Sequence, residues 1–199
     1  FLIQDLFVPG EIKLVYSHID RIITGAAVPV EPLKLTAGEE LRAEYFLQRR
    51  EMGVINIGST GRIVVDGRTY ELEYKEGMYI GMGAKDITFE SANPQEPARF
   101  YINSAPAHKE YPTVLIKPKG TPGDGVVIIK DENKVELGSL EEANHRVICK
   151  YILPGQVESC QLEMGMTKLE PGSVWNTMPC HTHDRRMEVY LYFEMPEDA

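Results

Sequence analysis

Two histidines and a glutamate near the end of the chain have the types and spacing to hold a metal ion. His181 and His183 are two residues apart, and Glu188 follows. In an extended strand, residues two apart point to the same face, so both imidazoles can reach one point. Glu188 is five residues after His183, so in a regular strand its side chain would point to the opposite face. It can join the histidines only if a turn or bulge lies between, and the polar stretch 184–186 can form one. Such a set suits Zn²⁺, Fe²⁺, Mn²⁺ or Ni²⁺ and leaves positions open for a substrate.

A His-x-His pair also occurs on protein surfaces without any metal, because short motifs match by chance. The position of Glu188 favours the metal site over this alternative, since it opens the aromatic run 189–193. We expect that run to form a strand. Cys180 lies between positions that face inward, so its thiol should point away from the histidines.

Length and composition limit the classes of protein to which this chain can belong. The 199 residues suffice for one large or two small domains, and 43% hydrophobic with 26% charged residues is typical of a globular protein. A net charge of −9 excludes nucleic acid as a natural partner, and an anionic substrate would need local Arg or Lys. No apolar run reaches the roughly 18 residues of a membrane span, and no leader for export is visible. Three irregularly spaced cysteines predict reduced thiols and a cytoplasmic location.

Short apolar stretches separated by glycines predict an all-β fold. Stretches 2–8, 12–16, 53–58 and 61–72 are typical of strands, and Asp66-Gly67 is a hairpin signal within the last. Segment 39–48 is the best candidate for a short helix or a polar loop. Many short strands with little helix favour a sandwich or barrel.

The chain divides into two predicted units. Prolines and glycines accumulate between residues 106 and 125, which predicts a barrel over 1–110, a linker over 111–125 and a second barrel over 126–199. Gln48-Arg49-Arg50-Glu51 resembles Asp184-Arg185-Arg186-Met187-Glu188, and each precedes an apolar stretch. We interpret this as a duplication in which the first barrel has lost its metal ligands. The chain stops soon after the motif, so we expect the second barrel to be truncated at its C-terminus.

Longer stretches of the sequence carry a specific resemblance. His-x-His followed by Glu188 resembles the first metal motif of the cupin superfamily, and the chain is similar to the 5-keto-4-deoxyuronate isomerases within it. The stretches that carry the resemblance are 16–21 (YSHIDR), 49–51 (RRE), 53–58 (GVINIG), 105–108 (APAH), 175–183 (WNTMPCHTH) and 185–190 (RRMEVY).

The resemblance implies a bicupin fold of two jelly-roll β-barrels, a homohexamer and one Zn²⁺ per subunit in the C-terminal barrel. The family holds zinc with three histidines and a glutamate, of which His181, His183 and Glu188 match three. The fourth ligand, a later histidine, has no counterpart before residue 199. The implied activity converts 5-keto-4-deoxyuronate, a small anionic sugar acid from pectin breakdown, to 2,5-diketo-3-deoxygluconate.

Candidate substrate-binding residues surround the motif. Arg185 and Arg186 are the nearest cations for the substrate carboxylate, although either can serve in a structural ion pair instead. Trp175 and Tyr190 are candidates to line the pocket, although aromatic residues at alternating strand positions are usually core. His18 and Arg21 form a polar cluster that either helps to hold a carboxylate or is a hydrogen-bonded structural corner; the general base is not evident.

Two rival functions remain open at this point. One is a different metal-dependent enzyme, such as a dioxygenase that binds Fe²⁺ through two histidines and a carboxylate. The other is a sugar-binding module without catalysis. Because cupin barrels support many chemistries, the fold alone does not choose between these functions and the isomerase.

Overall fold

The computed structural model describes residues 2–174 and 187–195. Within them the chain forms fourteen strands and a single turn of 3₁₀ helix, η1 (Asp131–Asn133), so the prediction of an all-β fold is confirmed. None of this described part is a helix long and apolar enough to cross a membrane.

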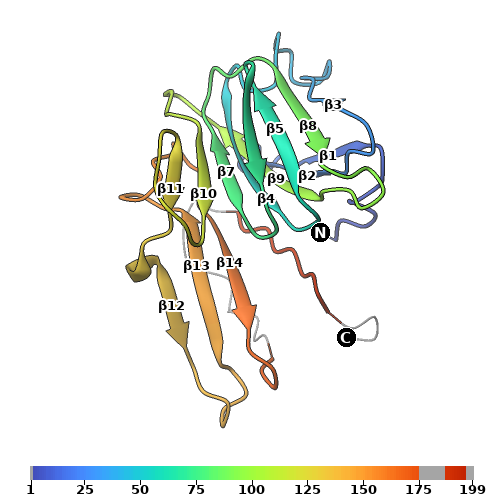
Figure 1. Cartoon of the computed structure of the whole chain (residues 1–199). Helices are drawn as coiled ribbons and strands as arrows, with labels where there is room; N and C mark the ends of the chain where they lie inside the picture. Colours follow the sequence, from blue (N-terminus) through green and yellow to red (C-terminus); the bar gives the residue numbers. More distant parts are fainter. Residues whose placement is uncertain (1, 175–186, 196–199) are drawn as a thin grey trace.

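Two sheets form a β-sandwich in the first part of the chain (Figure 1), which agrees with a jelly-roll barrel. The larger is antiparallel except for the parallel pair β10–β11. In spatial order its strands are β1 (Ile12–Tyr16), β2 (Ile23–Ala27), β9 (Phe100–Pro106), β4 (Arg50–Asn56), β7 (Gly77–Ile80), β10 (Val114–Lys117) and β11 (Val126–Ile128). The smaller sheet contains β3 (Leu33–Lys34), β8 (Ile87–Ser91), β5 (Gly61–Val65) and β6 (Arg68–Leu72).

One hydrophobic core fills the space between these two sheets. Side chains alternate along a strand, so Met52 and Val54 of β4 point into this core and share it with Phe89 of β8. The Phe89 ring packs against Phe100 of β9 at a centroid distance of 5.4 Å. Burial of such side chains from both sheets stabilises the sandwich.

A third sheet covers the opposite face of the large one. Its antiparallel strands are β12 (Lys134–Leu137), β13 (Arg146–Ile152) and β14 (Met164–Leu169). A second hydrophobic cluster joins it to the sandwich and contains Ile55 of β4, Tyr79 of β7, and Tyr151 and Ile152 of β13. All seven residues of β4 are therefore buried.

Local signals predicted several elements correctly. Asp66 and Gly67 both have positive φ, 49° and 84°, and connect β5 to β6 as the hairpin signal requires. Two expectations were wrong, because 2–8 and 189–193 contain no strand. Of the two alternatives for 39–48, the structure has the polar loop, since this segment consists of turns and bends. The two missing strands lack a neighbour in the described ladders, and a strand needs one to satisfy its backbone groups.

The division into two barrels and a linker stays a prediction. Strand β10 lies within the segment expected to be linker, and it pairs with β7 of the large sheet. Strand β11, expected at the start of the second unit, pairs with β10. The covalent path from the sandwich to the third sheet therefore runs along the edge of the large sheet.

Close approach of β4 to the third sheet requires a glycine at position 53. A Cβ atom there would lie 2.8 Å from Ile152 Cδ1 and 2.9 Å from both Leu162 Cδ2 and Met164 Sδ. We expect Gly53→Ala to lower the free energy of unfolding by about 1–3 kcal/mol, because three packed side chains must shift. Urea denaturation followed by tryptophan and tyrosine fluorescence measures this change.

Gly123→Ala is the matched control, because nothing lies within 4 Å of a Cβ at Gly123. Both variants lose the same unfolded-state freedom, worth about 0.4–1 kcal/mol, so the difference between them isolates the packing effect. Equal urea midpoints for the two variants would contradict the close approach.

Candidate active site

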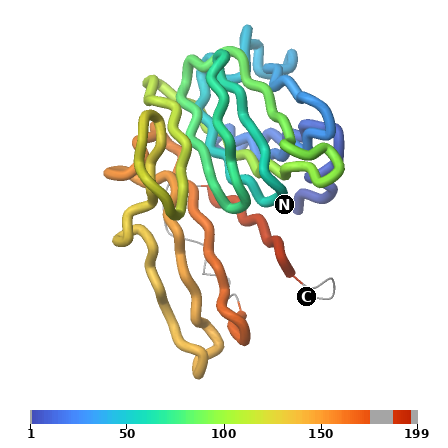
Figure 2. Tube along the Cα trace, in the orientation of Figure 1, coloured from blue at the N-terminus to red at the C-terminus, as the bar shows by residue number. Residues whose placement is uncertain are grey.

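The cavity that contains Glu188, here called the Glu188 cavity, has a volume of about 450 Å³. It lies where four segments distant in sequence meet: turn 20–22, strand β9, segment 161–163 and segment 187–190. Figure 2 shows residues 187–195 as an extended stretch of chain in red. The lining residues are Asp20, Ile22, Asn103, Ala105, Gln161, Leu162, Glu163, Met187, Glu188, Val189 and Tyr190.

Glu188 and Tyr190 form a hydrogen-bonded pair in this cavity. The Tyr190 hydroxyl donates to Glu188 Oε2 at 2.7 Å. This hydrogen bond, with a smaller effect of burial, raises the pKa of Tyr190 to about 12. The phenol therefore stays protonated at neutral pH and acts as a donor to the carboxylate.

The described lining of the Glu188 cavity is acidic. It contains the carboxyl groups of Asp20, Glu163 and Glu188 and no basic side chain. Carboxyl groups gathered in one cavity contribute a negative potential, which attracts positive ions and opposes an anionic substrate. A sugar acid would therefore need a metal ion or an arginine from elsewhere in the chain to bind here.

Asn103 contributes a fixed amide to the cavity from strand β9. Its Oδ1 atom accepts a hydrogen bond of 2.8 Å from Thr24 Oγ1 on β2, and both residues are buried. Thr24 thereby holds the Asn103 amide in place, with the amide nitrogen as its donor group.

The predicted site residues fall into two groups. His181, His183, Trp175, Arg185 and Arg186 lie outside the described residues. Glu188 and Tyr190 are described, and both line the same cavity.

His18 and Arg21 are exposed and do not line the Glu188 cavity. The His18 ring packs edge-on against Tyr16 at 5.3 Å. The Arg21 carbonyl accepts a hydrogen bond of 2.7 Å from Arg50, although its neighbours Asp20 and Ile22 line the cavity. These contacts are those of a hydrogen-bonded corner, and a role of His18 or Arg21 in holding a carboxylate stays a prediction.

Metal binding by the predicted set stays a prediction. In the parts of the chain that the structure describes, no group of three His, Cys, Asp or Glu side chains is arranged to hold a metal ion. Glu188 is the one predicted ligand among those residues. The acidic lining around it fits a cation, and His181 and His183 precede it by a few residues.

Three residues that the sequence did not predict also line the cavity, namely Asn103, Gln161 and Glu163. A signal existed for Asn103, because an amide inside an otherwise apolar strand is unusual. Gln161 and Glu163 carry no such signal, since polar residues before a strand are ordinary loop residues.

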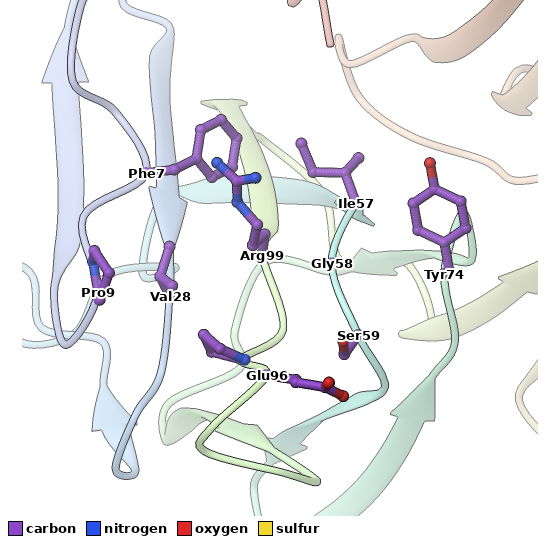
Figure 3. A pocket seen from close by; sticks show the side chains of 10 residues that line it. Phe7, Pro9, Val28, Ile57, Gly58, Ser59, Tyr74, Glu96 and Arg99 are labelled. Atoms are coloured by element: carbon purple, nitrogen blue, oxygen red, sulfur yellow. The ribbon is translucent and has the colours of Figure 1, made fainter. Parts of the chain in front are cut away.

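A second cavity, of about 540 Å³, lies at the other end of β4. Figure 3 shows the Arg99 guanidinium beside the Phe7 ring, with Tyr74 across the opening. The Arg99 Cζ atom is 4.9 Å from the Phe7 ring centroid, a cation–π contact. No predicted site residue among those that the structure describes lines this cavity, whereas Glu188 and Tyr190 line the other one, so the Glu188 cavity is the candidate active site.

Known proteins resemble this chain over its whole length. A model of the KduI/IolB family matches residues 2–197. A 4-deoxy-L-threo-5-hexosulose-uronate ketol-isomerase from Lachnoclostridium phytofermentans is 74% identical over 100% of this chain and 68% of that protein. The protein of the same name from Lachnospira eligens is 61% identical over 100% of this chain and 69% of its own length.

Among solved structures, an IolB-like protein from Salmonella typhimurium has a TM-score of 0.47 and 12% identity over 69% of this chain and 46% of that one. A likeness at this level carries no argument about function. The names of the close sequence relatives confirm the prediction of an isomerase. By its sequence, therefore, the chain belongs to the KduI/IolB family.

Proposed function

We propose that this protein is a metal-dependent ketol-isomerase that converts 5-keto-4-deoxyuronate to 2,5-diketo-3-deoxygluconate in the breakdown of pectin and related uronates. The observation that carries the proposal is the 74% identity, along the whole chain, to a protein named as the ketol-isomerase of this hexosulose uronate. The expected cytoplasmic location and homohexamer belong to the same proposal.

The reaction moves hydrogen between adjacent carbons and needs no external oxidant. The aldehyde carbon of the substrate becomes a CH₂OH group, and the neighbouring CHOH becomes a ketone. A bound divalent metal would polarise the carbonyl as a Lewis acid. Under the proposal His181, His183 and Glu188 hold that metal, and Arg185 or Arg186 binds the substrate carboxylate.

The acidic Glu188 cavity supports the need for a metal. Without a cation, its three described carboxyl groups would repel the carboxylate of a sugar acid. Asp20 and Glu163 line the cavity beside Glu188 and are the described carboxylates available to take and return a proton. The Asn103 amide can donate a hydrogen bond to a substrate oxygen.

Removal of the metal or of a ligand should abolish turnover. We expect the purified protein to contain one equivalent of zinc by plasma mass spectrometry and to lose activity after dialysis against a chelator. His181→Ala and Glu188→Gln should lower the metal content and kcat together. Glu188→Gln should keep the urea midpoint of the metal-free wild type, since Glu188 is exposed and only the stability contributed by bound metal is lost.

Leu140→Ala is a control for these variants, because Leu140 is exposed and does not line the cavity. An apoprotein that turns over substrate at the wild-type rate would refute the metal dependence. Oxygen consumption after loading with Fe²⁺, without isomerisation, would indicate a dioxygenase instead.

Solvent deuterium distinguishes two routes for the migrating hydrogen. In the enediol route a carboxylate removes the proton from the CHOH carbon and a proton returns to the former aldehyde carbon. In the hydride route the hydrogen moves directly between the carbons with its electron pair. We expect turnover in D₂O to place deuterium on the new CH₂OH group, as measured by proton NMR.

The variants Glu163→Gln and Asp20→Asn test which carboxylate of the cavity transfers the proton. Loss of the proton-transferring carboxylate should lower kcat by about 10²–10⁴-fold, and the variant that shows this loss identifies the base. Product without deuterium from the wild-type enzyme would refute the enediol route.

A further inference from the structure

Resting on the proposed function, we propose that Arg50 and Glu51 are positioning residues that fix two walls of the Glu188 cavity from within the sandwich. The two residues open strand β4 and are both buried. Neither lines the cavity itself. Each instead holds the backbone of a segment that does, and together they are called the Arg50–Glu51 brace.

The Glu51 carboxylate binds three consecutive backbone amides. Its Oε2 atom accepts hydrogen bonds from Cys160 N at 2.7 Å and from the Tyr79 hydroxyl at 2.8 Å. Its Oε1 atom accepts from Gln161 N at 2.7 Å and from Leu162 N at 2.8 Å. Successive amides that converge on one anion form a concave nest, which here encloses a side chain of the same molecule.

These hydrogen bonds fix the segment that leads into β14. Gln161 and Leu162 line the Glu188 cavity, and Glu163, the next residue, carries one of its carboxyl groups. Burial and the hydrogen bond to Glu51 both raise the pKa of Tyr79 above its ordinary value. The phenol therefore remains a hydrogen-bond donor to Glu51 at neutral pH.

Arg50 fixes the other wall, turn 20–22. Its Nη2 atom donates to the Arg21 carbonyl at 2.7 Å and to the Ser104 carbonyl at 2.7 Å. Asp20 and Arg21 have φ values of 49° and 54°, a conformation that residues with a side chain rarely adopt. Such a conformation persists only where the surroundings impose it, and the Arg50 hydrogen bond is a contact that does so.

Ser104 of β9 links the two halves of the brace. Its hydroxyl accepts a hydrogen bond from Arg50 Nε at 3.1 Å and donates one of 2.7 Å to the Glu51 carbonyl. Asn103 and Ala105, on either side of Ser104, line the cavity. The brace therefore connects three of the four segments that form the Glu188 cavity.

Stability alone does not account for two buried charges at this place. Burial lowers the pKa of Arg50 to about 10, and in segments 2–174 and 187–195 its guanidinium forms no ion pair. Charges that are hydrogen-bonded to neutral groups but lack an opposite charge are costly to bury compared with apolar side chains. The two charged side chains instead hold the backbone of neighbouring segments in place. Each of these segments carries a carboxyl group of the cavity, Asp20 in one and Glu163 in the other.

Asn56, at the far end of β4, is a neutral counterpart and a matched control. It is fully buried, its Nδ2 atom donates to the carbonyls of Ser59 and Leu72, and its Oδ1 atom accepts from Gly58 N and Arg99 N. These bonds fix the wall of the other cavity, far from Glu188 along the strand. Asn56→Asp and Glu51→Gln are isosteric exchanges that each remove part of a buried backbone clamp.

The test is steady-state kinetics of the zinc-loaded full chain with 5-keto-4-deoxyuronate, well below the unfolding temperature of every variant. We expect Glu51→Gln and Arg50→Lys to lower kcat/KM by about 10- to 100-fold with unchanged zinc content. Glu51→Asp, which keeps the charge, should recover part of that loss. Asn56→Asp should stay within about twofold of the wild type although it also loses stability.

Hydrogen exchange of backbone amides gives a readout that does not depend on turnover. Exchange should accelerate at residues 160–163 in Glu51→Gln and at residues 17–22 in Arg50→Lys, and at neither in Asn56→Asp. Equal kinetic losses in Glu51→Gln and Asn56→Asp, or wild-type kcat/KM in Glu51→Gln, would overturn the proposal. If the wild type does not turn over the substrate, the proposed function fails, and the exchange pattern alone supports or overturns the brace.

Discussion

Burial of the large sheet on both faces is the constraint on which the rest of the structure depends. One face of β4 packs in the sandwich core and the other packs against β13 and its neighbours. Every polar group on this strand must therefore find its partner inside the protein. Gly53 permits the close approach of the third sheet, and Arg50, Glu51 and Asn56 are each satisfied by backbone groups of other segments.

This constraint also decides where the cavities form. The middle of β4 is apolar and closely packed, whereas its two ends carry the buried polar side chains that hold loops in place. Glu51 stands at the end near the Glu188 cavity, and Asn56 stands at the end near Arg99. Loops held by a rigid strand keep their shape without hydrophobic cores of their own, which suits them to bear functional groups.

The electrostatics of the Glu188 cavity connect its structure to its chemistry. A chain of net charge −9 places three carboxyl groups in one cavity, in a family whose named relatives act on a uronate. Under the proposed function, a cation between them would reconcile an anionic substrate with the acidic cavity. Under the proposed function, Glu188 serves the metal, while Asp20 and Glu163 are the carboxyl groups proposed to transfer a proton.

The sequence by itself determined the features that depend on neighbouring residues. Asp66-Gly67 predicted its hairpin because positive φ at both positions is a local property of those residue types. The stretches around Arg49 and His181 predicted the family because a resemblance between short stretches of sequence can be recognised without knowing which residues they contact in the fold. Residues 189–193 showed the limit of such signals, since they have the pattern of a strand and form none.

Only the tertiary structure decided which residues form the site. Glu51 was visible in the sequence as part of an Arg-Arg-Glu stretch, but its partners at 160–162 lie more than a hundred residues away. Asp20, Asn103 and Glu163 come together in one cavity because β9, turn 20–22 and the approach to β14 meet at one end of β4. Hydrogen bonds and packing between segments that are distant in sequence bring these residues together. No single stretch of sequence contains both partners of such a contact.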